Sequence, residues 1–188
     1  MKKFGHVIDD NCGGDEIIGG YPKRLVIMPT CGIKKYPVRE TSPEGLKDIC
    51  THTGTFEFHE DKQPPMVIDV IPGSVNYKAD PQGEIGSESF KPSGSFRMKD
   101  KREADGLAKF VMNTPCVMVI PEHNETEQFF VGNKNLPCKI TAGFDSGTGA
   151  SDARGYTFNY EAEASFVPKQ YLASPMDIDA LAEGTETV

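Results

Sequence analysis

Length, composition and charge already exclude several classes of protein. The chain has 188 residues, enough for one domain of ordinary size with a hydrophobic core, although only 37% of them are hydrophobic. Its formal net charge of −8 argues against a simple DNA-binding or membrane-binding role, because both surfaces are negatively charged. No apolar run approaches the roughly 20 residues of a membrane span, and no hydrophobic segment follows Lys2 and Lys3 as in a secretory signal.

The first part of the chain predicts a polar arm followed by short strands. Residues 1–22 are polar and rich in glycine, which indicates an N-terminal arm. An apolar strand follows at 25–28 and ends at Pro29. Further strands are expected from alternating or apolar patterns at 55–59, 66–71 and 74–78.

Residues 79–93 interrupt the strand patterns. They contain two prolines and two glycines with few apolar side chains, which predicts a long exposed loop or an irregular hairpin. Long loops of this kind are uncommon in compact domains unless they serve a function. A strand pattern returns at 94–98.

An amphipathic helix is predicted at about residues 100–112. Asp100 followed by Glu103 is typical of a helix start, and Asn113 and Pro115 indicate its end. The apolar side chains fall at helical spacing and are expected to pack on a sheet. They are Ala104, Leu107, Ala108, Val111 and Met112.

The remainder predicts more strands. Apolar segments at 116–120, 128–131 and 138–140 indicate strands, and the first of them is apolar enough to be buried on both faces. A flexible loop is expected at 143–155, followed by a long strand at 154–164. This strand places Tyr156, Phe158 and Tyr160 on one face. The opposite face carries Glu161 and Glu163. Residues 173–188 are acidic and indicate a C-terminal arm, which leaves 23–172 as the β domain.

The cysteines and histidines do not form a metal-binding pattern. The cysteine count is odd and no CxxC occurs, which favours scattered reduced thiols, with Cys116 and Cys138 in the core. No histidine stands at the spacing of a metal motif. No phosphate-binding or dinucleotide-binding glycine motif is present either, so we expect no metal and no cofactor.

One short motif points to catalysis. The segment 145–148 (Asp-Ser-Gly-Thr) matches the signature of aspartic proteases, which need two such carboxylates sharing a proton. One copy would require a homodimer, and the preceding residues are not the usual apolar strand. A turn of small residues is the simpler interpretation, and we expect no enzyme.

Four segments of the chain resemble the tail tube proteins of long-tailed bacteriophages and prophages. The most specific is a Gly/Ser/Thr turn that runs into a strand beginning with Gly155 and Tyr156. The four segments are 12–14 (Cys-Gly-Gly) with the strand at 24–28, 73–77 with its following loop, 105–110 with the apolar 117–120, and 146–158.

This resemblance implies a β-sandwich or barrel with a flanking helix. It also implies a virion structural protein whose copies form rings of six that stack into a tube, assembled in the host cytoplasm. Its partners would be its own copies and other tail or neck proteins, with DNA as a cargo that does not adhere and no membrane. Glu161 and Glu163 would face the lumen. The loop between rings would include Asp80, Gln82, Glu84, Ile85, Glu88 and Phe90.

Other functions remain open on sequence grounds. A head–tail joining ring or a tail-terminator ring would share this fold. A non-viral β-sandwich that binds a ligand or a surface would share the strand pattern without assembling. The dimeric aspartic protease built on Asp145 is the enzymatic alternative.

Overall fold

Short strands joined by turns dominate the chain. The computed structural model describes residues 24–123, 126–148 and 154–184. The expected arm at 1–22, including His6 and Cys12, therefore lies outside the described residues. The strands are β1 (Arg24–Pro29), β2 (Ile33–Lys35), β3 (Val38–Arg39), β4 (Thr51–Thr53), β5 (Glu57–Phe58), β6 (Met66–Asp69), β7 (Asn76–Gln82), β8 (Ser89–Lys99), β9 (Cys116–Pro121), β10 (Gln128–Val131), β11 (Lys139–Asp145), β12 (Gly155–Glu161) and β13 (Gln170–Leu172). The helices are α1 (Leu46–Ile49), α2 (Arg102–Val111) and α3 (Ile178–Gly184), with a 3-10 turn, η1 (Thr30–Gly32).

The large sheet is built around β9. Its strand order is β3-β4-β13-β10-β9-β1-β6, and its strand pairs are antiparallel except for β13 beside β4. Every residue of β9 is buried, which confirms the burial on both faces predicted from its apolar sequence.

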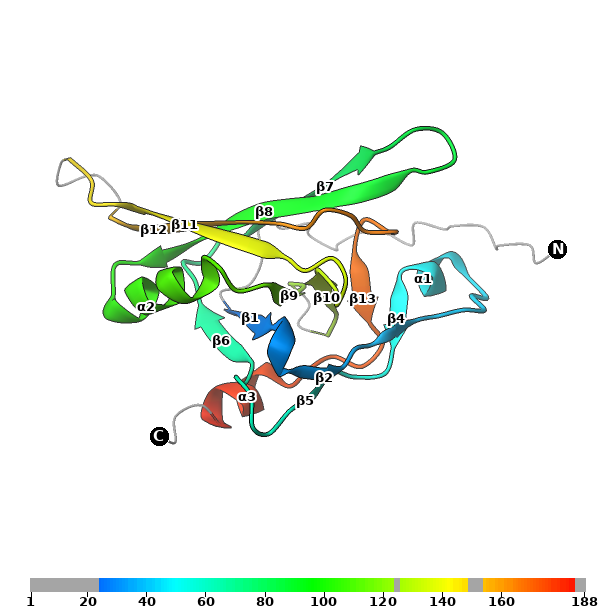
Figure 1. Cartoon of the computed structure of the whole chain (residues 1–188), viewed down its shortest axis with the longest axis horizontal. Helices are drawn as coiled ribbons and strands as arrows, with labels where there is room; N and C mark the ends of the chain where they lie inside the picture. The colour runs from blue at the N-terminus through cyan, green and yellow to red at the C-terminus, as the bar shows by residue number, and fades with distance from the viewer. Residues whose placement is uncertain (1–23, 124–125, 149–153, 185–188) are drawn as a thin grey trace, which may run out of the picture.

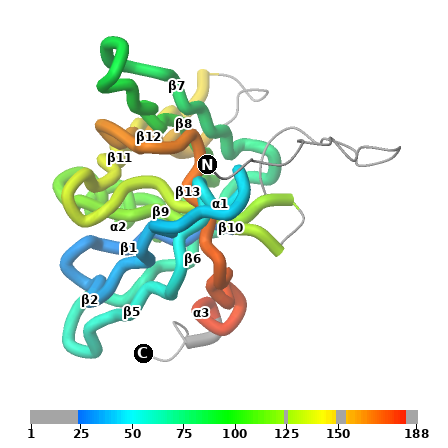
Figure 2. The backbone as a smooth tube through the Cα atoms, turned by 90° about the vertical axis from the view of Figure 1, so that its right-hand side faces the viewer, coloured from blue at the N-terminus to red at the C-terminus, as the bar shows by residue number. Residues whose placement is uncertain are grey.

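The small sheet has the order β11-β12-β8-β7 and is antiparallel throughout. It lies over the large sheet, as Figures 1 and 2 show. The predicted mainly β fold, a sandwich with a flanking helix, is confirmed.

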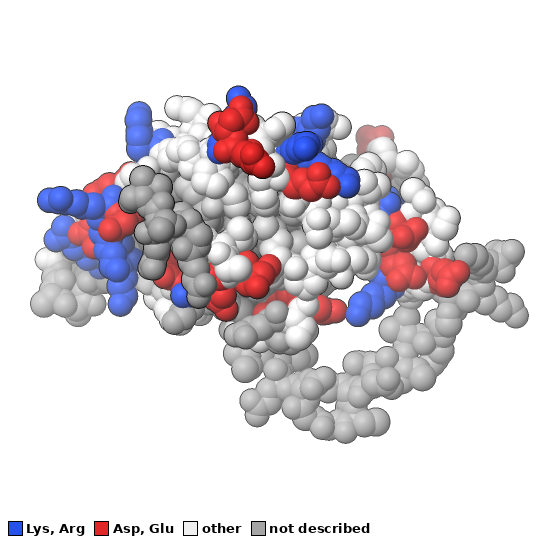
Figure 3. Space-filling view, turned by 90° about the horizontal axis from the view of Figure 1, so that it is seen from below, with Lys and Arg blue, Asp and Glu red and all other residues white. Residues whose placement is uncertain are grey.

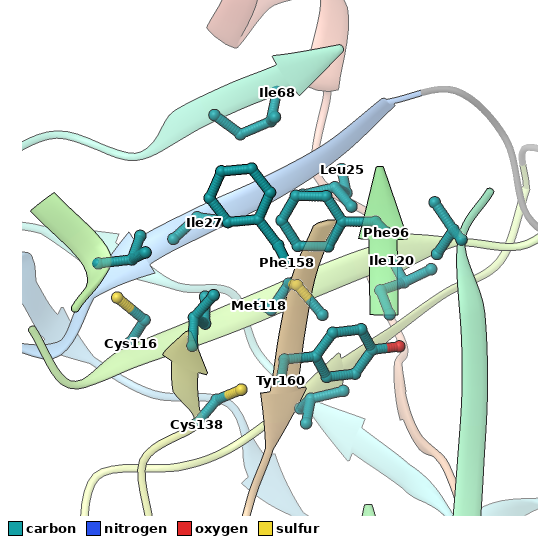
Figure 4. Close-up of a cluster of buried hydrophobic side chains, with 14 of the residues drawn as sticks. Leu25, Ile27, Ile68, Phe96, Cys116, Met118, Ile120, Cys138, Phe158 and Tyr160 are labelled. Carbon is teal, nitrogen blue, oxygen red and sulfur yellow. The ribbon is translucent and has the colours of Figure 1, made fainter. Parts of the chain in front are cut away.

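The main core lies between the two sheets. Phe96 on β8 and Phe158 on β12 are fully buried, and their rings stack with centroids 4.9 Å apart and planes within 4° (Figure 4). Tyr160 is also buried, and its hydroxyl donates to the backbone carbonyl of Asn76. Gly94 leaves room for this contact, because a Cβ there would lie 2.5 Å from the Tyr160 hydroxyl oxygen. Tyr156, Phe158 and Tyr160 thus face the core as predicted.

The large sheet is covered on its other face as well. Alternate residues of β1 and β9, such as Val26 and Val119, belong to a second hydrophobic cluster there. The antiparallel pair β2–β5 and the segment around Met176 cover this cluster. In Figure 2, β2, β5 and α3 form this layer, on the side away from the small sheet.

Helix α2 is the flanking helix, and its predicted apolar stripe is largely confirmed. Ala104, Leu107 and Val111 are buried against the main core. Two details differ from the prediction. Met112 is 54% exposed because it follows the last helical residue. Asp100 does not cap the helix, which starts after Lys101, because its carboxylate pairs with the Arg154 guanidinium instead.

Residues 79–93 form a regular hairpin. Strands β7 and β8 pair in unbroken register from Asn76 opposite Ser95 to Gln82 opposite Ser89, which leaves only 83–88 as the turn. Similarly, β11 extends to Asp145, so the predicted flexible loop at 143–155 begins later than expected. Both segments belong to the small sheet, which has only one buried face. Strands of such a sheet alternate polar and apolar residues and need few apolar side chains, which explains both differences.

The C-terminal segment lies along the large sheet as far as it is described. Helix α3 is adjacent to β6 (Figure 1), and Arg24 connects them through ion pairs to Asp69 (3.0 Å) and Asp179 (2.6 Å). Ile178 packs on the second cluster. Residues 173–184 therefore cover part of the domain surface.

Replacing Leu107 by Ala should lower the free energy of unfolding by about 2–5 kcal/mol, because the side chain is buried and a cavity would remain. Met112→Ala is the matched control and should change stability by less than about 0.5 kcal/mol. Chemical denaturation of both variants measures the difference. Equal effects would mean that α2 does not pack through this stripe.

Candidate functional site

The small sheet presents a polar face on the side away from the core. Its residues follow from the register, since residues directly opposite each other in antiparallel strands share a face. We call this surface the polar sheet face. Its residues are Asn76, Lys78, Asp80, Gln82, Ser89, Lys91, Ser93, Ser95, Arg97, Lys99, Lys139, Thr141, Gly143, Asp145, Gly155, Thr157, Asn159 and Glu161.

Hydrogen bonds connect neighbouring strands across this face. The Asn76 amide nitrogen donates to the Ser95 hydroxyl (3.0 Å), and the Ser95 backbone N–H donates to the Asn76 amide oxygen (2.9 Å). Asn159 and Thr141 continue the same row across β12 and β11. A shallow groove of about 490 Å³ follows this row. The centre of the face is therefore uncharged and polar.

Both predicted glutamates lie at one end of this face. Glu161 is exposed, lies opposite Lys139 in register, and forms an ion pair with Lys91 at 3.3 Å. Glu163 is exposed beyond the end of β12. A second groove, of about 420 Å³, is lined by both glutamates and both lysines. The structure thus brings the two predicted residues together, with lysines that sequence reasoning missed.

The charges of the polar sheet face are mixed. Lys78 pairs with Asp80 at 2.8 Å, in addition to the pair between Lys91 and Glu161. Lys139, Arg97 and Lys99 are further cations on the same face, and Asp145 is a further carboxylate. The face of a single copy is therefore not predominantly acidic, which differs from the expectation drawn from the net charge. The acidic residues of the chain are distributed over other surfaces as well.

The six residues predicted for the inter-ring loop separate into two groups. Asp80 and Gln82 belong to β7 and Phe90 to β8. The Gln82 side chain donates to the Glu163 carbonyl (2.6 Å), and Phe90 pairs with Ser165 through two backbone hydrogen bonds. The other three, Glu84, Ile85 and Glu88, lie in the turn. We call these three the hairpin tip. Ile85 is 99% exposed there.

No further described strand pairs with the two edges of the small sheet, although α2 lies beside β11. Its edge strands β7 and β11 have seven residues each. By contrast, edge strand β3 of the large sheet has two residues, and edge strand β6 lies beside α3. A long edge strand without a partner strand is a site where another strand can pair.

The motif that suggested catalysis, residues 145–148, lies at the end of β11. Asp145 ends β11, and its carboxylate accepts the Gly147 backbone N–H (2.9 Å), as in an ordinary turn.

Within residues 24–123, 126–148 and 154–184, no three His, Cys, Asp or Glu side chains are grouped so that they could hold a metal ion. Cys116 and Cys138 lie opposite each other and are buried, as predicted for core residues. Burial raises the pKa of Cys116 to about 12.

A cluster near β13 was not anticipated from the sequence. Lys169 Nζ forms an ion pair with Glu122 (2.5 Å) and lies 4.9 Å from the centroid of the Phe129 ring. The Tyr171 hydroxyl donates to the same carboxylate (3.0 Å), and burial raises the Tyr171 pKa to about 12. These residues tie the loop after β12 to the large sheet. Their distance along the chain hid the cluster from pattern analysis.

Comparison with known proteins assigns no family. No protein-family model, no curated protein and no solved structure matches the chain. Among the described helices, none is both long and apolar enough to cross a membrane.

His52 should make the stability depend on pH. It is buried, and its Nδ1 has no hydrogen-bond partner among the described residues. Burial lowers its pKa, more than the Cys50 backbone raises it, and the Arg39 charge lowers it further. A lowered folded-state pKa means that stability is complete above the unfolded value of about 6.5 and is lost as the pH falls through the folded value.

Wild-type protein should therefore lose more stability between about pH 7 and pH 5 than a His52→Gln variant. Denaturant unfolding across this pH range measures the loss. His59→Gln changes an exposed histidine and serves as the control. The interpretation fails if the wild type and His52→Gln show the same pH dependence.

Proposed function

We propose that this chain is a virion structural protein, a subunit of the stacked rings that form a phage tail tube. The observation that carries the proposal is the small sheet, which has a polar face and two long edge strands, β7 and β11, with which no further described strand pairs. The four sequence segments that resemble tail tube proteins support it independently.

The topology of the small sheet suits joining between copies. Because β11, β12, β8 and β7 alternate in direction, β7 and β11 run in opposite directions. A copy related by rotation can therefore place its β7 antiparallel to β11 of its neighbour. Repetition of this contact continues the antiparallel order and closes a ring, for which we propose six copies.

The free edge of β11 has hydrogen-bonding groups for such a contact. Cys138, the residue before β11, exchanges two backbone hydrogen bonds with Cys116, on the side away from β12. Because the backbone groups of successive residues point to opposite sides of a strand, the N–H and C=O of Lys139 and Thr141 point toward β12. The same alternation directs the backbone groups of Ile140 and Ala142 to the open side.

In such a ring the polar sheet face would line the passage, with Glu161 and Glu163 facing the lumen. DNA would pass without adhering, because Lys78 and Lys91 of this face pair with carboxylates. The hairpin tip would contact the next ring. The partners are then further copies and other tail or neck proteins, and the location is the virion tail after assembly in the host cytoplasm.

Negative-stain microscopy and sedimentation of the purified protein test the proposal. Hollow tubes or stacked rings support a tube subunit, and single rings that do not stack support a tail-terminator or joining ring. A monodisperse monomer at every concentration and salt condition would contradict both and leave the ligand-binding or surface-binding module.

Ala142→Pro should prevent ring formation, because proline removes a backbone donor from the open edge of β11. The fold should remain intact, since proline is tolerated on edge strands. Ala142→Ser keeps the N–H and is the matched control. Circular dichroism and sedimentation velocity distinguish lost assembly from lost folding. A folded Ala142→Pro variant that still forms rings would exclude β11 as the joining edge.

Reversing Glu161 and Glu163 to Lys should make assembled tubes bind DNA. The change removes the carboxylate beside Lys91 and adds positive charge to the groove, so binding should weaken steeply as salt is raised. Fluorescence anisotropy with labelled duplex DNA measures it. The control reverses Glu60 and Asp61, which are exposed and lie outside the polar sheet face. Tubes of the Glu161/Glu163 variant that ignore DNA at low salt would refute the lumen assignment.

A further inference from the structure

The open edge of β11 can accept another strand over only part of its length. At Cys138, the residue before β11, both backbone hydrogen bonds on this side go to Cys116 of β9 (3.1 and 2.7 Å). A strand added to β11 therefore has no hydrogen-bonding position at Cys138. The nearest positions that remain are Ile140 and Ala142, whose backbone groups point to the open side.

The open edge of β7 is limited by a proline. The Pro92 carbonyl of β8 accepts a backbone N–H from the residue after β12 (2.9 Å), so the backbone groups of the neighbouring Lys91 point toward β7. Asp80 lies opposite Lys91, and its backbone groups therefore point to β8. The groups of Ala79 and Pro81 then point to the open edge. Ala79 can both donate and accept there, whereas Pro81 has a carbonyl but no N–H.

These two limits restrict how β7 of one copy can align with β11 of the next. If Pro81 lies opposite Ile140 or Ala142, the carbonyl of that residue has no donor. If Ala79 lies opposite Cys138, its N–H meets a carbonyl that is already bonded. One alignment avoids both losses, with Ala79 opposite Ile140. Pro81 then reaches the position of Cys138, where β9 already pairs and the added strand must turn away.

Charges on the polar sheet face favour the same alignment. The residues next to the paired ones face outward, so Asp80 of one copy lies opposite Lys139 of the next. Asp80 keeps its ion pair with Lys78 of its own copy, and Lys139 stays opposite Glu161. The signs therefore alternate across the three strands. A shift of β7 by two residues would instead place Lys78 opposite Lys139, two like charges.

Charge on a larger scale does not align two copies. The polar sheet face carries charges of both signs. Figure 3 shows Lys and Arg beside Asp and Glu on the side of the molecule away from the small sheet as well. The position of one copy against the next therefore depends on the local pairing of strands.

We infer that β7 of one copy pairs with β11 of the next in a single register. The opposed pairs are Lys78 with Thr141, Ala79 with Ile140, and Asp80 with Lys139. The inference rests on the proposed function, and it names the residues that set the position of each copy in the ring. Asp80 and Lys139 determine the register through their charges, and Pro81 ends the contact.

Disulfide crosslinking tests this register. Three double variants share Thr141→Cys and differ in the second change, which is Asn76→Cys, Lys78→Cys or Asp80→Cys. Thr141 and Lys78 of neighbouring copies would form a pair without mutual backbone hydrogen bonds, with Cα atoms about 4.5 Å apart, which suits a disulfide. The other two partners would lie diagonally, beyond disulfide reach. Within one copy the two cysteines are three strand spacings apart, about 14 Å, so every link joins two copies.

After mild oxidation with diamide, the variant with Lys78→Cys should form at least about tenfold more linked chains on a non-reducing gel than the other two. The single variant Thr141→Cys is the control for links through native cysteines, such as the exposed Cys31. Negative-stain microscopy verifies that each variant still forms rings.

The outcomes separate the inference from the proposed function. Stronger crosslinking through Asn76→Cys or Asp80→Cys would overturn the register and leave the proposed function standing. Rings that crosslink in none of the three variants would mean that β7 and β11 do not meet, which also overturns the inference. A wild type that forms neither rings nor tubes would overturn both.

Discussion

The burial of Phe96, Phe158 and Tyr160 against β9 is the constraint on which the rest of the structure depends. Phe96 and Phe158 lie directly opposite each other in the β8–β12 register, and their stacked rings fix that register. A shift of one residue would move these aromatic groups into solvent and bring Glu161 into the core. The inner aromatic residues therefore determine which side chains form the polar sheet face, although they do not touch it.

The same constraint makes the two sheets unequal. The large sheet is buried on both faces, so its strands are apolar and its described edges are short or lie beside α3. The small sheet has only one buried face, so its strands alternate and extend beyond the core into the two hairpins. A strand supported on one side by hydrogen bonds and on one face by the core needs no further strand beside it. Its open edge is then available to another chain.

Local periodicity predicted the parts of this structure that depend on local chemistry. The stripe of α2, the burial of β9 and the inward direction of Phe158 and Tyr160 all follow from spacing within single segments. The pairing of segments did not. Nothing in the sequence of β1 indicates that it lies between β6 and β9. Likewise, residues 79–93 contain turn-forming residues that lie within paired strands. Pro81 is tolerated there because it lies on an edge strand, where a missing backbone N–H costs little.

The candidate site was predictable in position but not in charge. Alternation along β12 placed Glu161 on the outer face, but its partners come from elsewhere: Lys91 lies 70 residues earlier on β8 and Lys139 on β11. Such contacts depend on register between distant strands, which composition does not reveal. The net charge of −8 suggested an acidic wall, whereas the register produces a wall of mixed charge. The distinction matters for the DNA passage that we propose. An acidic wall repels phosphates over a Debye length, which depends on salt, whereas lysines beside carboxylates release few counterions to a passing duplex at any ionic strength. In the proposed tube, a wall of this second kind would keep DNA mobile without the repulsion that would oppose its entry.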